Sequence, residues 1–124
     1  MIKMHTSPFS AHPVEARQNV SRKLRGKYPD RVPIIIRTNP NGKQIQLDTF
    51  KFLTPKDITL ARFLFELRSH VKSLSPHAAI YLLLEDGTLP PISSLLSSLD
   101  DKHKNVDGFL YFICCEENTF GQSL

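Results

Sequence analysis

The sequence is poor in cysteine. Its 124 residues contain only two, Cys114 and Cys115, and these are adjacent. Adjacent cysteines cannot build a disulfide framework, and no CxxC motif is present. Such usage is typical of a protein from a reducing compartment. We therefore expect a cytoplasmic protein whose fold does not depend on disulfides.

Long hydrophobic runs are also missing. No apolar stretch approaches the roughly 20 residues that cross a bilayer as a helix. The first residues, Met1–His5, are not followed by the apolar segment and small-residue cleavage site of a signal peptide. Because 40% of the residues are hydrophobic and 23% are charged, the composition is that of an ordinary globular protein. The length fits one domain.

The signatures of catalysis and metal binding are absent as well. The five histidines have no ligand spacing with a cysteine or an acid, and there is no P-loop, GxGxxG or GxSxG. A nucleophilic Cys114 or Cys115, paired with a distant histidine, is the remaining candidate. Both end a predicted strand, where one should face the core and one the solvent, and buried cysteines are usually inert. We predict no enzyme, no catalytic residue, no metal and no cofactor.

Positive charge gathers near the start of the chain. The net charge is +4, and the early cluster consists of Arg17, Arg22, Lys23, Arg25, Lys27 and Arg31. Such a cluster can face nucleic acid, an anionic membrane or an acidic partner, or it can be a solvated helix face. Because the cluster lacks interleaved aromatics and any RNP-like or zinc-finger signature, nucleic acid is the weakest of these alternatives.

Hydrophobic periodicity predicts a helix followed by a sheet wrapped on a second helix. Helices are expected over 14–27, 54–71 and 93–99, and strands over 32–37, 80–84, 109–114 and part of 44–53. The second helix is placed from Thr54 because Pro55 suits a first helical turn and Asp57 complements its positive end. Residues 115–124 are expected to fray. This order indicates an α+β fold of the β-grasp pattern.

Two segments resemble the GABARAP and microtubule light-chain family of autophagy modifiers. The first is His12-Pro13-Val14-Glu15 with Lys27-Tyr28-Pro29-Asp30-Arg31-Val32-Pro33, and the second is Asp107-Gly108-Phe109-Leu110-Tyr111 with Thr119-Phe120-Gly121. The resemblance extends from about residue 12 to residue 121. It implies a ubiquitin-like β-grasp with one or more additional N-terminal helices. The implied divisions are an arm or short helix over 1–13, a modifier domain over 14–121 and a propeptide over 122–124.

The resemblance implies a protein tag that other enzymes attach to a lipid. In the family, a cysteine protease trims the tail after a glycine, and activating and conjugating enzymes of the autophagy pathway pass the new carboxylate to phosphatidylethanolamine. That glycine would be Gly121, with Phe120 as an anchor before it. A residue without Cβ lets a flexible tail enter a narrow active-site channel. The tag would be cytoplasmic at first and would lie on the autophagosome membrane after lipidation.

The resemblance also implies a groove for cargo receptors that carry short aromatic-x-x-aliphatic motifs. A peptide would add as a strand to the edge at Lys51-Phe52-Leu53. The aromatic pocket would use Val20, Leu24, Pro33, Lys51, Leu53 and Phe109. The aliphatic pocket would use Phe52, Pro55, Ile58, Phe63 and Glu66. Acids flanking the motif would meet Lys51, Arg31 and the basic helix that ends at Lys27. Tyr28, next to this helix, is also expected to contact the peptide.

Three residues depart from the family pattern in this groove. Val20 stands where relatives often carry an acid, Thr54 replaces an aliphatic wall residue, and Glu66 stands where an apolar residue is common. We expect these changes to alter peptide preference, above all at the aliphatic pocket. Two alternatives stay open: the groove residues could be plain core, and the protein could be a peptide adaptor that is never conjugated.

Overall fold

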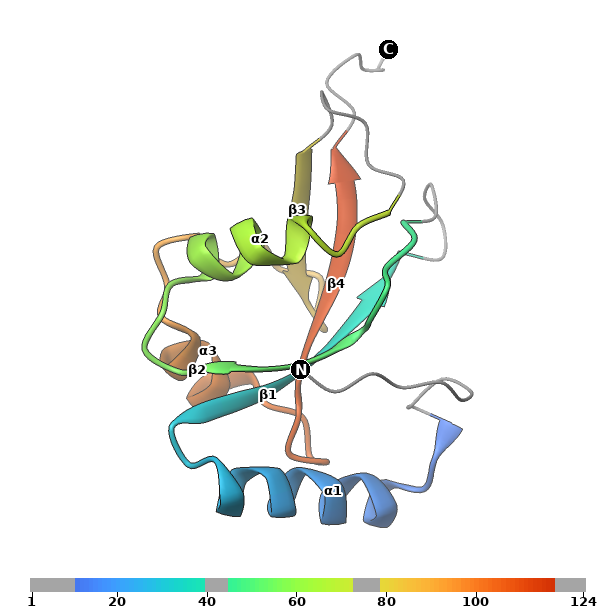
Figure 1. Cartoon of the computed structure of the whole chain (residues 1–124), viewed down its shortest axis with the longest axis vertical. Helices are drawn as coiled ribbons and strands as arrows, with labels where there is room; N and C mark the ends of the chain where they lie inside the picture. The colour runs from blue at the N-terminus through green and yellow to red at the C-terminus, as the bar shows by residue number, and fades with distance from the viewer. Residues whose placement is uncertain (1–10, 40–44, 73–78, 118–124) are drawn as a thin grey trace.

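The computed structural model describes residues 11–39, 45–72 and 79–117. Within these ranges the chain forms three helices and four strands (Figure 1). In chain order they are α1 (Val14–Lys27), β1 (Arg31–Thr38), β2 (Lys51–Pro55), α2 (Leu60–Arg68), β3 (Ala79–Leu84), α3 (Leu96–His103) and β4 (Leu110–Glu117). The predicted first helix is confirmed at both ends.

The four strands form one mixed sheet in the order β2-β1-β4-β3. The parallel pair β1–β4 lies at its centre, and antiparallel strands flank it on both sides. Helix α1 crosses one face of the sheet and α2 lies over the other (Figure 1). This is the predicted β-grasp architecture with an added N-terminal helix.

The main core lies between the sheet and α2. Residues Leu60, Phe63 and Leu67 recur at helical spacing and are buried against the sheet, where Phe52 and Ile34 also belong to the core. The rings of Phe52 and Phe63 meet edge to face, with centroids 5.6 Å apart. Each such side chain contributes roughly 1.5–3 kcal/mol by its removal from water.

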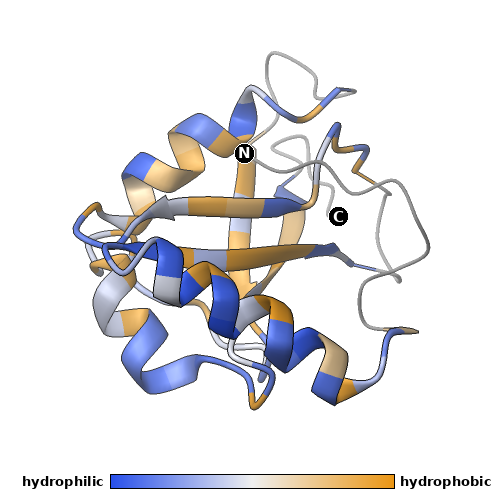
Figure 2. Ribbon diagram, turned by 60° about the horizontal axis from the view of Figure 1, so that its bottom comes forward, coloured by the Kyte–Doolittle hydropathy of each residue, from blue (hydrophilic) through white to orange (hydrophobic). Residues whose placement is uncertain are grey.

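A second, smaller core lies between the sheet and α1. It is formed by buried Ile35, Phe109 and Tyr111, against which Val20 and Leu24 of α1 pack. The strand β1 is therefore buried on both faces, which explains its unbroken apolar run. In Figure 2 the central strands are mainly orange, whereas α1, which offers only a narrow apolar stripe, is mainly blue.

The carboxylate of Asp107 fastens α1 to the sheet. Fully buried, it accepts hydrogen bonds from Arg17 Nε of α1 at 3.0 Å, from the backbone N–H of Phe109 at 2.9 Å and from the Tyr111 hydroxyl at 2.5 Å. Burial and this hydrogen bond raise the pKa of Tyr111 above its ordinary value, so its hydroxyl remains a donor. One side chain thus joins a helix, a loop and a strand.

The close approach of α1 to the loop before β4 requires a glycine. Gly108 has a φ of +89°, and a Cβ at this position would lie 2.2 Å from the hydroxyl oxygen of Ser21. The Ser21 hydroxyl instead donates to the backbone carbonyl of Asp107 at 2.6 Å. Both the backbone conformation and the available space therefore select glycine.

The second predicted helix begins and ends differently from the expectation. Pro55 is the last residue of β2, where it faces Arg31 in the pairing register, and α2 begins only at Leu60. The Thr59 side chain caps the helix by accepting from the backbone N–H of Arg62. The predicted start was wrong because a proline fits the end of an edge strand as well as a first helical turn.

Two other boundaries also differ. The last helix covers Leu96–His103 rather than 93–99. The strand β4 continues to Glu117, so residues 115–117 are ordered where fraying was expected. They continue the strand because β3 pairs with them, with Ala79 opposite Glu117. Cross-strand partners that lie far away in sequence leave no local signal.

We predict that Asp107→Asn lowers the free energy of unfolding by roughly 1.5–3 kcal/mol, because it removes the charge that Arg17 meets inside the protein. Urea denaturation of the full chain measures this change. The control is Asp101→Asn, which alters an exposed acid of α3 and should stay within about 0.5 kcal/mol of wild type. Equal effects of the two substitutions would contradict the role assigned to Asp107.

Candidate functional site

The strand β2 is an edge of the sheet, since β1 is its neighbour in the strand order and none follows on the other side among the described residues. Its side chains alternate between the two faces. Lys51 and Leu53 lie opposite Ile35 and Pro33, on the face that α1 covers. Phe52 points to the main core. One short strand therefore contributes to both layers.

The antiparallel register directs particular main-chain groups of β2 away from β1. Ile36 N–H bonds to the Phe50 carbonyl, so the hydrogen-bonded pairs alternate from that position. Lys51 and Leu53 fall between them, and their N–H and C=O groups point outward. Pro33, which has no N–H, lies opposite Leu53 in a pair that exchanges no hydrogen bonds, so the missing donor does not weaken the β1–β2 pairing. The guanidinium of Arg31 donates to the outward Leu53 carbonyl at 3.2 Å.

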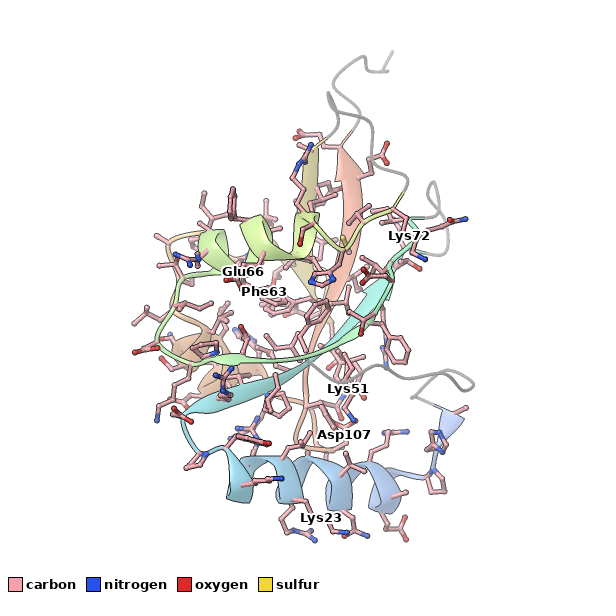
Figure 3. All side chains as sticks on the ribbon, viewed as in Figure 1. Lys23, Lys51, Phe63, Glu66, Lys72 and Asp107 are labelled. Atoms are coloured by element: carbon pink, nitrogen blue, oxygen red, sulfur yellow. The ribbon has the colours of Figure 1, made fainter. Side chains whose placement is uncertain are left out.

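The predicted aromatic pocket corresponds to the region between β2 and α1. Val20 and Leu24 pack with Phe109 there, and the Lys51 ammonium lies 5.3 Å from the centre of the Phe109 ring. Lys51 is only 5% exposed, and burial lowers its pKa from the ordinary value. Its charge is therefore held inside the pocket region rather than displayed on the surface. Figure 3 shows Lys51 on the α1 side of β2.

Three residues of this region were not predicted as site residues. Ile35 and Tyr111 form its buried floor with Phe109, and half-buried Phe50 packs against them. Phe50 and Phe52 are two residues apart, which in a continuous strand puts them on one face. They lie in different cores because β2 begins only at Lys51. Strand periodicity was the available signal for the floor, because Tyr111 lies two residues after Phe109 in a predicted strand and Ile35 is the middle of three consecutive isoleucines.

The predicted basic set does not act as one surface. Arg25 makes two hydrogen bonds to the Asp100 carboxylate, at 2.7 and 2.9 Å, and two to the Gly108 carbonyl. It is therefore an anchor between α1 and α3. Lys27 is exposed, and its ammonium lies 5.5 Å from the centre of the Tyr28 ring. A substitution of Arg25, made to test whether the basic residues attract acidic peptides, would therefore also disturb the packing of α1.

A cavity of about 300 Å³ lies between β2 and α2, on the other side of the strand. Its lining consists of Arg31, Phe52, Leu53, Thr54, Pro55, Phe63, Glu66, Leu67 and His70. Four of the five residues predicted for the aliphatic pocket are in this set. The fifth, Ile58, packs against the main core instead. Figure 3 shows Phe63 and Glu66 together on this side of β2.

The rim of this cavity is polar. Glu66 is exposed and lies 3.4 Å from the Nε of Arg62, one turn earlier on α2. His70, which was not predicted as a site residue, has its Nδ1 2.8 Å from Asp48 and its ring edge-on to Phe52. Thr54 is buried in the wall. An apolar floor with a charged rim suits a short side chain better than a long aliphatic one.

The two cysteines are both buried, which corrects the expectation that one would face solvent. Cys114 belongs to the main core, whereas Cys115 is covered on the opposite face, next to Tyr81 of β3. Burial, reinforced by the neighbouring Cys115, raises the pKa of Cys114 to about 12. Cys114 is therefore a neutral thiol at physiological pH, which makes it a poor nucleophile.

Some of the predicted sites fall outside the described residues. These are Phe120 and Gly121, the propeptide over 122–124 and the first ten residues of the arm expected over 1–13. Among the described ranges, no cluster of three or more histidine, cysteine or acidic residues could hold a metal ion. Within the same ranges, no helix is long and apolar enough to cross a membrane.

Comparison with known proteins decides the family. The family described as autophagy protein Atg8, ubiquitin-like, matches residues 16–121. The chain belongs to the Atg8 family. Autophagy-related protein 8 of Dictyostelium discoideum is 39% identical over 122 residues, which cover 98% of this chain and 99% of that protein. Autophagy-related protein 8A of Oryza sativa subsp. indica is 40% identical over 112 residues, covering 90% of this chain and 92% of the relative.

A solved structure supports the same Atg8 assignment. The crystal structure of Trypanosoma brucei ATG8 superposes on this chain with a TM-score of 0.81 at 35% identity, and it covers 95% of this chain and 100% of that one. The resemblance inferred from the sequence is thus confirmed, and so is the ubiquitin-like fold. The protein is an Atg8-family, ubiquitin-like autophagy protein.

Proposed function

We propose that the protein is a non-enzymatic modifier that is conjugated through Gly121 to phosphatidylethanolamine and recruits partners through β2. A processing protease would remove residues 122–124, and activating and conjugating enzymes of the autophagy pathway would transfer the new carboxylate. Cargo receptors with aromatic-x-x-aliphatic motifs would then be gathered on the autophagosome membrane. Membership of the Atg8 family supports this role.

The observation that carries the binding part is the outward edge of β2 with a pocket region on each face. An added peptide strand needs main-chain partners and two alternate side-chain pockets. The outward groups of Lys51 and Leu53 offer the first, and the α1-side region and the α2-side cavity offer the second. The Arg31 guanidinium must leave the Leu53 carbonyl as the peptide arrives, and a motif acid can take its place as the partner of Arg31.

We predict that wild-type protein loses residues 122–124 and gains one phospholipid, whereas Gly121→Ala stays unconjugated because a Cβ obstructs the tail in the enzymes' channels. Intact-mass analysis of the protein recovered from its own cells, before and after starvation, measures both steps. A chain that ends at Gly121 is the matched control and should be lipidated without prior cleavage. Lipidation of Gly121→Ala at the wild-type level rejects the conjugation proposal.

We predict that Leu53→Ala weakens an aromatic-x-x-aliphatic peptide by roughly 1–3 kcal/mol, because it removes an apolar wall that the peptide covers. Calorimetric titration measures the affinity, and thermal unfolding checks that the fold survives.

Glu66→Leu should bind the same peptide about fivefold more tightly, equivalent to roughly 1 kcal/mol, because it makes the cavity rim apolar.

Glu66→Gln is the control for that substitution, since it removes the charge and keeps the shape. It should fall between wild type and Glu66→Leu. A folded Leu53→Ala protein that binds as tightly as wild type shows that the peptide does not lie along β2. Unchanged affinity in Glu66→Leu would show only that the charge of Glu66 at the cavity rim does not weaken peptide binding.

A further inference from the structure

A second groove lies between α1 and the loop that leads from α3 into β4. It has a volume of about 440 Å³ and is lined by α1 side chains on one wall and by residues 104–108 on the other. Figure 1 shows this loop reaching α1 on the side of the molecule where Asp107 is labelled in Figure 3. We call it the α1 groove. The proposed lipidation and the peptide edge of β2 make no use of it.

The floor of the α1 groove is fixed by hydrogen bonds. Gln18 donates to the Val106 carbonyl at 3.0 Å, Ser21 to the Asp107 carbonyl at 2.6 Å and Arg25 to the Gly108 carbonyl at 3.1 Å. Three successive carbonyl oxygens of the loop are therefore occupied by one helix. The groove is preformed, and its main acceptors are already used.

The charges of the α1 groove are unbalanced toward the positive. Its own carboxylate, that of Asp107, is neutralised by Arg17, and the nearby Asp100 is neutralised by Arg25. Arg22 and Lys104 are exposed on opposite walls, and no acid pairs with either of them among the described residues. Arg22 contacts only the neutral amide of Asn19, at 3.0 Å. Glu85, which contacts the loop through Asn105, is also paired with Arg37.

An exposed apolar side chain, that of Val106, also lines the α1 groove. Val106 is 78% exposed, although its carbonyl is held by Gln18. An inorganic ion or a phosphate chain would make no apolar contact with this side chain. No aromatic ring lines the groove among the described residues, so bases would find no stacking platform. A peptide offers both of the missing elements, carboxylates and an apolar contact.

We propose that the α1 groove binds an acidic segment of a partner protein, in which an apolar side chain covers Val106 and flanking carboxylates meet Arg22 and Lys104. Helix geometry separates Arg22 from Val20 by roughly 160° around α1. The segment therefore occupies the opposite flank of the helix from the aromatic pocket region. One copy of the protein can hold a motif peptide on β2 and an acidic segment on α1 at the same time.

The test uses the full-length protein labelled with ¹⁵N and a blocked five-residue peptide with leucine at its centre and two acids on each side. Titration should shift the amide signals of Gln18, Arg22, Lys104 and Val106 along one saturable curve. Arg22→Gln and Lys104→Gln should each weaken binding roughly 2- to 5-fold, as expected for exposed charge pairs. Lys23→Gln, an exposed cation on the same helix, is the matched control and should leave binding unchanged.

Val106→Ser separates the apolar contact from charge. It should weaken the leucine peptide and have no effect on the same peptide with glycine at its centre. Saturating the protein with an aromatic-x-x-aliphatic peptide beforehand should leave the dissociation constant of the acidic peptide unchanged. The acidic site can therefore be rejected without rejecting the peptide site on β2, and the reverse also holds. Because Arg22, Lys104 and Val106 are all exposed, these variants should fold, and their spectra check it.

Three results overturn the proposal. Shifts that spread over the exposed lysines, or an equal loss in Lys23→Gln, indicate nonspecific charge attraction. Displacement of the acidic peptide by the motif peptide places it on β2. Tighter binding of a single-stranded oligonucleotide of matched charge, with shifts at the same four amides, makes nucleic acid the occupant and rejects the acidic peptide.

Discussion

The candidate site depends on the hydrogen bonds that the buried carboxylate of Asp107 accepts. This carboxylate holds Arg17 of α1, the hydroxyl of Tyr111 and the backbone of Phe109 together. The other attachments of α1 are its narrow apolar stripe, the ion pair of Arg25 with Asp100 and hydrogen bonds to the carbonyls of the loop before β4, and none of these hydrogen bonds reaches Tyr111. A lone buried charge would be costly, yet here one carboxylate has three donors, so its desolvation is offset. The floor of the aromatic pocket region is set by the same contacts.

The parallel pair β1–β4 forms the centre of the sheet and carries a layer of packed side chains on each face. Because both strands are buried on both faces, α1 and α2 can each close a layer against the sheet, and the outer strand β2 contributes to both. The two pocket regions of the β2 edge therefore belong to different cores. A substitution in one region should therefore leave the other region intact.

The sequence predicted the elements better than it predicted their ends. The three consecutive isoleucines 34–36 marked a strand, which the structure shows to be buried on both faces, and the spacing of Leu60, Phe63 and Leu67 marked the central helix. Pro55 misled, since proline suits an edge strand and a helix start equally. The positions of Arg25, Phe50 and His70 depend on partners 22 to 83 residues away, or on where a strand begins. Local patterns carry no information about such partners.

The central claim is that Asp107 positions the aromatic pocket of β2. A double-mutant cycle tests it most directly: wild-type protein and Asp107→Asn are each titrated with an aromatic-x-x-aliphatic peptide and with the same peptide carrying alanine in place of the aromatic residue. Such cycles isolate the coupling between two sites. If Asp107 positions the pocket, Asp107→Asn weakens the intact peptide much more than the alanine peptide. Equal weakening of both peptides, or none, in a protein that remains folded would contradict this claim.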